Sequence, residues 1–76
     1  MLAPAQIRMA RAAVGMSVRA LAELSGVADS TIHRYETNRG GMQTTTLGRL
    51  QTALETAGVV FIPADAQGGP GVRLKA

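Results

Sequence analysis

Glycines at three positions divide the first 58 residues of the chain into short segments of helical periodicity. Within these segments, apolar residues recur every three or four positions, which is the spacing of one face of an α-helix. A glycine directly after such a segment suits the left-handed conformation that often ends a helix, because it has no Cβ atom to clash with the backbone. Gly15, Gly26 and Gly58 therefore predict three helix ends and a mainly α fold class.

The first two helices can be bounded at both ends. Proline suits the first helical turn, where its missing N–H group is not needed, so the first helix is expected over Pro4–Val14. The Ser17 hydroxyl can accept a backbone N–H group from the first turn of the second helix, which makes Ser17 its expected N-cap. Leu21 and Leu24 are expected to form the buried face of this second helix.

Two further helices are expected before residue 59. The third runs from about residue 28 to residue 36, and residues 38–41 form a loop after it. Thr44 or Thr45 is expected to cap the fourth helix, which ends before Gly58. The residues expected to face the core are Val27, Ile32 and Tyr35 around the third helix, and Leu47, Leu50, Leu54 and Ala57 along the fourth.

After Gly58 the pattern changes from helical to extended. The segment Val59–Ile62 is β-branched and aromatic and is limited by Pro63, so it predicts a strand. Residues 64–71 are rich in Gly, Pro, Asp and Gln and predict a loop, whereas residues 72–75 alternate apolar with basic side chains, as a half-buried strand does. The expected organisation is a helical domain over residues 1–58 and a C-terminal β-hairpin over residues 59–76.

The hairpin raises a question of stability, because two short strands are marginal in water and leave unpaired edges. Pairing across the axis of a homodimer would satisfy those edges and make the hairpin a dimerisation element. The alternative is that the hairpin only folds back on the fourth helix. The side chains expected at the dimer interface are Phe61, Ile62, Val72 and Leu74.

Composition narrows the class of partner. The 76 residues contain no cysteine and one histidine, which excludes disulfides and leaves too few ligands for a zinc site, so no metal or other cofactor is expected. A net charge of +3 suits a polyanionic partner such as nucleic acid. No stretch approaches the roughly 20 apolar residues of a membrane span. Pro4 and Gln6 interrupt any signal-peptide pattern, so a cytoplasmic protein is expected.

Residues 18–39 meet the steric requirements of a helix-turn-helix. Two helices that cross at a steep angle need a small residue at their contact, here Ala22, and the tight turn between them needs a residue tolerant of positive φ, here Gly26. Val27, Ile32 and Tyr35 give the second of these helices an apolar underside.

These features resemble those of the Cro/C1-type, or XRE-type, helix-turn-helix transcriptional regulators over roughly residues 5–58. The resemblance implies a lambda-repressor-like four-helix DNA-binding domain. It also implies a repressor that binds a palindromic operator in double-stranded DNA as a homodimer. The residues that carry the resemblance are Gln6-Ile7-Arg8 and Arg11, Gly15-Met16-Ser17, residues 21–27, Ser30-Thr31-Ile32 and Arg34-Tyr35-Glu36.

The resemblance assigns base reading to the start and the outer face of the third helix. The matching positions hold Asp29, Ser30, His33 and Arg34. Arginine can bind guanine through two hydrogen bonds, serine can serve a base or a phosphate, and aspartate can accept from the amino group of cytosine. Asp29 has an equally good alternative role, because the dipole favours a carboxylate in the first turn of a helix.

The resemblance also implies contacts to DNA phosphates, notably from Arg39 in the loop after the third helix. The alternative is a solvated surface position, which we expect for Arg8. The candidates for phosphate contact are Ser17, Arg19, Thr31, Asn38 and Arg39.

The family pairs an arginine of the first helix with a glutamate at the end of the third, and Arg11 and Glu36 match these positions. We expect them to form a structural ion pair that fixes the third helix. Two positions depart from the family. Val18 replaces the usual glutamine at the start of the second helix, and Ala28 replaces the Ser or Thr that caps the third.

Two other functions can be weighed against DNA binding. An enzyme is not expected, because the single histidine lies on a helix face beside Arg34 with no nucleophile or paired carboxylates around it. The stronger alternative is an antiactivator or antitoxin that uses the helix-turn-helix scaffold to bind another protein. Val18 and Ala28 favour this alternative, because they remove two groups that commonly contact DNA.

Overall fold

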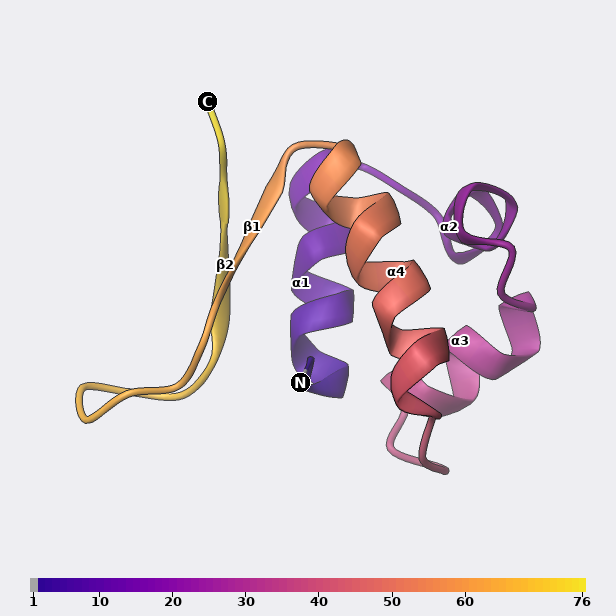
Figure 1. The fold of residues 1–76 in the computed structure, drawn as a ribbon, viewed down its shortest axis with the longest axis horizontal. Coiled ribbons are helices and arrows are strands. Elements are labelled where there is room, and N and C mark those ends of the chain that lie inside the picture. The colour runs from indigo at the N-terminus through magenta and orange to yellow at the C-terminus, as the bar shows by residue number, and fades with distance from the viewer. Residues whose placement is uncertain (1) are drawn as a thin grey trace.

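The computed structural model describes residues 2–76, which form a mainly helical domain with a β-hairpin at its end. The helices are α1 (Pro4–Val14), α2 (Val18–Ser25), α3 (Asp29–Glu36) and α4 (Thr44–Thr56), and the antiparallel strands are β1 (Val59–Ile62) and β2 (Gly71–Leu74). In Figure 1, α1 and α4 occupy the centre, with α2 and α3 on one side and the hairpin on the other. The predicted fold class and order of elements are confirmed.

The helix ends follow the prediction at most positions. Gly15 and Gly26 have φ angles of 66° and 73°, in the left-handed region, and the Ser17 hydroxyl accepts the Ala20 N–H group at 3.0 Å. The predicted threonine cap of α4 is wrong. The carbonyl of Gln43 already accepts the Leu47 N–H group at 2.9 Å, so the helix begins at Thr44 and the N-cap lies one residue earlier.

The core lies between the four helices and extends to Val59 of β1, which packs on α1 and α4. Two predicted members are absent from it. Leu24 is 64% exposed and borders an open groove along α4, and Ala57 is exposed directly after the last residue of α4. The buried apolar residues are Leu2, Ile7, Ala10, Leu21, Val27, Ile32, Tyr35, Leu47, Leu50, Leu54 and Val59.

The hairpin packs on α1 and on α4. Val59 is fully buried, and the cross-strand partners Phe61 and Val72 pack against the core from the same face of the hairpin. Folding back on the fourth helix was the simpler expectation, and the structure adds α1 as the larger contact. The second strand begins at Gly71 and ends at Leu74, one residue earlier at each end than predicted.

A buried glutamine joins α1 to the hairpin. Gln6 is 2% exposed, and its side-chain Nε2 donates to the carbonyl oxygens of Ile62 and Gly71, each at 3.1 Å. Its Oε1 accepts the Ala3 N–H group at 2.8 Å, which satisfies a free donor at the start of α1. Because Ile62 and Gly71 are paired across the hairpin, Gln6 holds both strands at the same level.

Tyr35 makes a second buried link, from α3 to the start of the chain. Its hydroxyl donates to the carbonyl oxygen of Leu2 at 2.6 Å. Burial raises the pKa of the Tyr35 phenol above its ordinary value, so the group stays a neutral donor at physiological pH. The link ties the underside of α3 to the segment that precedes α1.

Candidate nucleic-acid interface

The turn between α2 and α3 is short and internally bonded. Gly26 donates its N–H group to the carbonyl of Ala22 at 2.9 Å, and Val27 is buried directly after it. The Ser25 hydroxyl donates to the carbonyl of Leu21 at 2.7 Å and accepts the Val27 N–H group at 3.2 Å. Sequence reasoning assigned no role to Ser25, although a serine just before a turn is a recognised signal for such local bonds.

The outward surface of α3 gathers the four predicted base readers. Asp29, Ser30, His33 and Arg34 are all exposed, whereas Ile32, Tyr35 and Glu36 on the other side of the helix are buried. Ser30 lies three residues before His33, and both Asp29 and His33 and Ser30 and Arg34 are four residues apart. Side chains at these spacings are neighbours on a helix, so the four form one continuous polar surface. We call Asp29, Ser30, His33 and Arg34 the α3 surface.

The chemistry of the α3 surface suits the edges of bases. Arg34 presents a forked donor, Ser30 a hydroxyl that donates or accepts, and His33 a ring with both functions. Asp29 is the first residue of the helix, where the dipole also favours it. The N-cap, Ala28, offers no side-chain hydrogen bond, as expected from the sequence.

The loop after α3 lies against the end of that helix. Asn38 has a φ angle of 60°, and this left-handed residue lets the Arg39 N–H group donate to the carbonyl of Arg34 at 2.9 Å. The Thr37 hydroxyl donates to the carbonyls of His33 and Arg34, at 2.9 and 3.2 Å. Asn38 and Arg39 are exposed. Because Arg39 is bonded to the carbonyl of Arg34, both residues lie close to the C-terminal end of the α3 surface.

The other candidates for phosphate contact lie at the starts of α2 and α3. Ser17 and Arg19 are exposed at the beginning of α2, where Ser17 also caps the helix. Thr31 is half-buried near the start of α3. The structure therefore places Ser17 and Arg19 on one helix start, and Asn38 and Arg39 at the end of the next.

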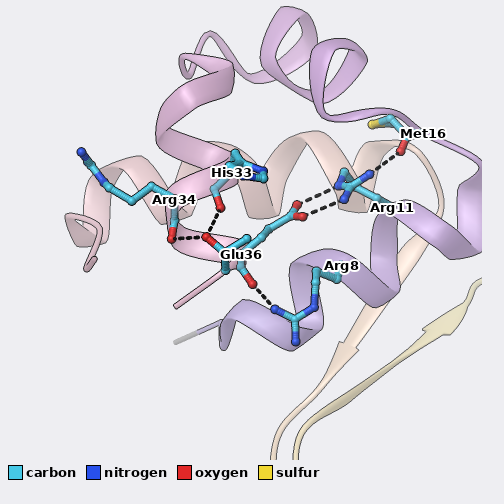
Figure 2. Close-up of polar contacts among 7 residues, drawn as sticks. Arg8, Arg11, Met16, His33, Arg34 and Glu36 are labelled. Atoms are coloured by element: carbon cyan, nitrogen blue, oxygen red, sulfur yellow. Dashed lines mark hydrogen bonds and ion pairs between the residues drawn. The ribbon is translucent and has the colours of Figure 1, made fainter. Parts of the chain in front are cut away.

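Two arginines of α1 hold the end of α3, as Figure 2 shows. Arg11 donates from Nε to Glu36 Oε2 and from Nη2 to Glu36 Oε1, both at 2.7 Å, in a forked ion pair. A third Arg11 nitrogen donates to the carbonyl of Met16 at 3.1 Å, so the same side chain also fixes the loop before α2. The hydrogen bond to Glu36 raises the pKa of Arg11 above its ordinary value.

Arg8 differs from the sequence expectation. We expect a solvated charge, but the Arg8 side chain donates from Nη1 to the backbone carbonyl of Glu36. The last carbonyls of a helix have no partner within the helix, and a basic side chain satisfies one here. Arg8 was missed because its partner lies 28 residues further along the chain.

The described residues 2–76 offer few other kinds of site. They contain no group of three or more His, Asp or Glu side chains placed to hold a metal ion. Within the same residues, each helix is too short or too polar to cross a lipid bilayer.

Comparison with known families agrees with this geometry. Residues 5–60 match the family model of the helix-turn-helix domain, a match that includes α1 from its second residue, α2, α3, α4 and the start of β1. No curated protein matches the chain. Because the match covers more than half of the 76 residues, the chain belongs to the helix-turn-helix domain family.

Proposed function

We propose that this protein is a sequence-specific DNA-binding transcriptional regulator of the Cro/C1 type, a repressor that binds a palindromic operator as a homodimer. The observation that carries the proposal is the α3 surface. Its four polar side chains are exposed together on a helix that is held at its C-terminal end by Arg8 and Arg11. A rigid helix with exposed hydrogen-bonding groups is what direct reading of the major groove requires.

The proposed division of labour follows the positions of the side chains. The α3 surface reads base edges, while Arg19, Arg39 and the neutral donors Ser17, Thr31 and Asn38 hold the phosphate backbone on either side. The proposed mode of regulation is repression, in which a bound dimer covers a promoter and excludes polymerase.

Footprinting on a site selected from a random double-stranded DNA library tests the proposal. Two recognition helices related by a two-fold axis should protect an inverted repeat whose half-sites lie about one helical turn, roughly 34 Å, apart. Protection of a single half-site without an inverted repeat would contradict the homodimer. A protein that selects no sequence would contradict specific DNA binding.

Alanine substitutions of the two exposed arginines near the end of α3 should change DNA binding in different ways. Arg34→Ala should lose about 1 to 3 kcal/mol of binding free energy and relax the preference at one base pair, because it removes a base contact. Arg39→Ala should weaken binding to all sequences alike and flatten the salt dependence by about one unit, because it removes a phosphate contact. Titrations of each variant at several salt concentrations check this. The opposite pair of phenotypes would place the base reader in the loop.

A protein-binding role is a second candidate, and one observation favours it. Leu24 is 64% exposed beside a groove of about 770 Å³ that is lined by residues of α2 and α4 and by Ala57 directly after α4, and by none of α3. An antiactivator or antitoxin would use such an apolar surface for its partner protein. The footprinting experiment separates the two functions, because a protein of this second kind need not protect any DNA on its own.

A further inference from the structure

The glycine pair in the loop after α3 contains one position that is occupied by a neighbouring side chain. A Cβ atom at Gly40 would lie 3.2 Å from Nε and 3.3 Å from Cδ of Arg34, closer than ordinary van der Waals contact. The φ angle of Gly40 is not in the positive region, so the backbone there could carry any residue. A side chain at this position would therefore crowd Arg34, although the backbone conformation itself would accept one.

We infer that Gly40 is a specificity-determining position, because its missing side chain lets the Arg34 stem rest against the loop. This inference rests on the proposed function and on Arg34 as a base reader. Figure 2 shows the Arg34 side chain extending away from Arg8 and Arg11, so neither the α1 arginines nor Glu36 determine its direction. The loop after α3, which lies beside the Arg34 side chain at Gly40, is therefore the part of the protein that orients this side chain.

The loop is itself fixed relative to Arg34. The carbonyl of Arg34 accepts the N–H group of Arg39 at 2.9 Å and the hydroxyl of Thr37 at 3.2 Å. Gly40 follows Arg39 directly, so the backbone beside the Arg34 side chain is anchored to the carbonyl of the same residue. A rigid support of this kind matters for a long side chain, because a bidentate contact needs its atoms held within about 0.5 Å, and ordering a free arginine opposes binding.

Gly41 provides a matched control. A Cβ atom at Gly41 would have no neighbour within 4 Å, and its φ angle is also outside the positive region. Gly40→Ala and Gly41→Ala therefore make the same chemical change in adjacent residues and restrict the unfolded chain equally. They differ in whether the new methyl group displaces Arg34.

The experiment selects binding sites from a random double-stranded DNA library with the full chain and with each variant. Gly41→Ala should keep every base preference of the wild type. Gly40→Ala should reduce the preference at the base pair that Arg34→Ala also relaxes, by about three- to tenfold, because its shift of the guanidinium weakens a bidentate contact. In an Arg34→Ala background, Gly40→Ala should have no further effect on preference.

Other outcomes would overturn the inference in distinguishable ways. If the wild type selects a site and Gly40→Ala keeps all its preferences, the role of Gly40 is wrong while the proposed function stands. If the effect persists without Arg34, the loop acts through its backbone and the inference is again wrong. If the wild type selects no sequence, the proposed function fails and the role of Gly40 fails with it. Proton NMR of the free protein checks the contact without DNA, since Gly40 Hα should show a nuclear Overhauser effect to the Arg34 side chain.

Discussion

Glu36→Ala is expected to lower the free energy of unfolding by about 3 kcal/mol, because it leaves the Arg11 guanidinium without its carboxylate. Glu36 is 4% exposed and Arg11 is 21% exposed, so the pair is mostly shielded from water. Breaking a buried pair typically costs about 3 to 5 kcal/mol, and the partial exposure of Arg11 places this pair at the lower end. Urea unfolding followed by circular dichroism measures the change.

Two controls separate the charge from the packing. Arg8→Ala removes a hydrogen bond to the Glu36 backbone carbonyl from an exposed side chain, so it should destabilise the protein less than Glu36→Ala. The double variant Arg11→Met/Glu36→Leu replaces the pair by apolar residues and should recover most of the loss, because no charge is left without a partner. A Glu36→Ala protein as stable as the wild type would show that the ion pair contributes nothing.

The same substitution bears on function through the position of α3. Arg11 contacts both Glu36 and the carbonyl of Met16, so it ties the end of α3 to the loop before α2. Releasing that end frees the α3 surface to change its angle to DNA. Operator affinity should therefore fall for Glu36→Ala even under conditions where the variant is fully folded, although Glu36 itself is too buried to touch DNA.

Local rules accounted for most of the helix ends and most of the core. Glycine and serine act within one turn of the backbone, and Gly15, Gly26 and Ser17 were predictable for that reason. The prediction that Leu24 is buried was wrong because α2 has only eight residues, and two turns of periodicity do not determine which side of a helix is covered. Whether Leu24 is covered depends on the neighbouring helix α4, and an open groove lies between Leu24 and α4.

The features that sequence reasoning missed depend on contacts far apart in the chain. Gln6 was noted in the family resemblance, but its partners Ile62 and Gly71 lie 56 and 65 residues away. A buried glutamine looks like any surface glutamine until the topology brings two carbonyls to it. Gly40 was predicted only as part of a loop, because its contact with Arg34 depends on how that loop returns to the helix.

A connected set of contacts runs from the hairpin to the α3 surface. Gln6 binds both strands to α1, and Arg8 and Arg11 on the same helix bind the end of α3. If the hairpin forms the dimer, these contacts transmit the dimer geometry to the recognition helices. Their spacing would then be set by packed and hydrogen-bonded elements and not by a flexible linker, which suits an operator with one fixed spacing.

Removal of the hairpin does not isolate its role in the dimer. Val59 is fully buried, and the side chain of Gln6 would lose both carbonyl partners if the chain ended at Gly58. Such a protein should be unstable whether or not the hairpin dimerises. Among the residues expected at the dimer interface, Phe61 and Val72 pack against the chain's own core, whereas Leu74 is 45% exposed and can be changed with less harm to the monomer.

If the protein is the proposed homodimer, Leu74→Glu is therefore expected to give a folded monomer and to lower operator affinity by about 100-fold or more, because each monomer would read only half of the site. In a two-fold interface the substitution acts twice and removes two apolar contacts. It also brings two like charges towards the axis. Leu24→Glu is the matched control, since it makes the same change at a residue that is 64% exposed on α2. Sedimentation and binding titrations on both variants decide the matter. If Leu74→Glu still sediments as a dimer and binds DNA as tightly as Leu24→Glu, the hairpin serves only to pack the monomer.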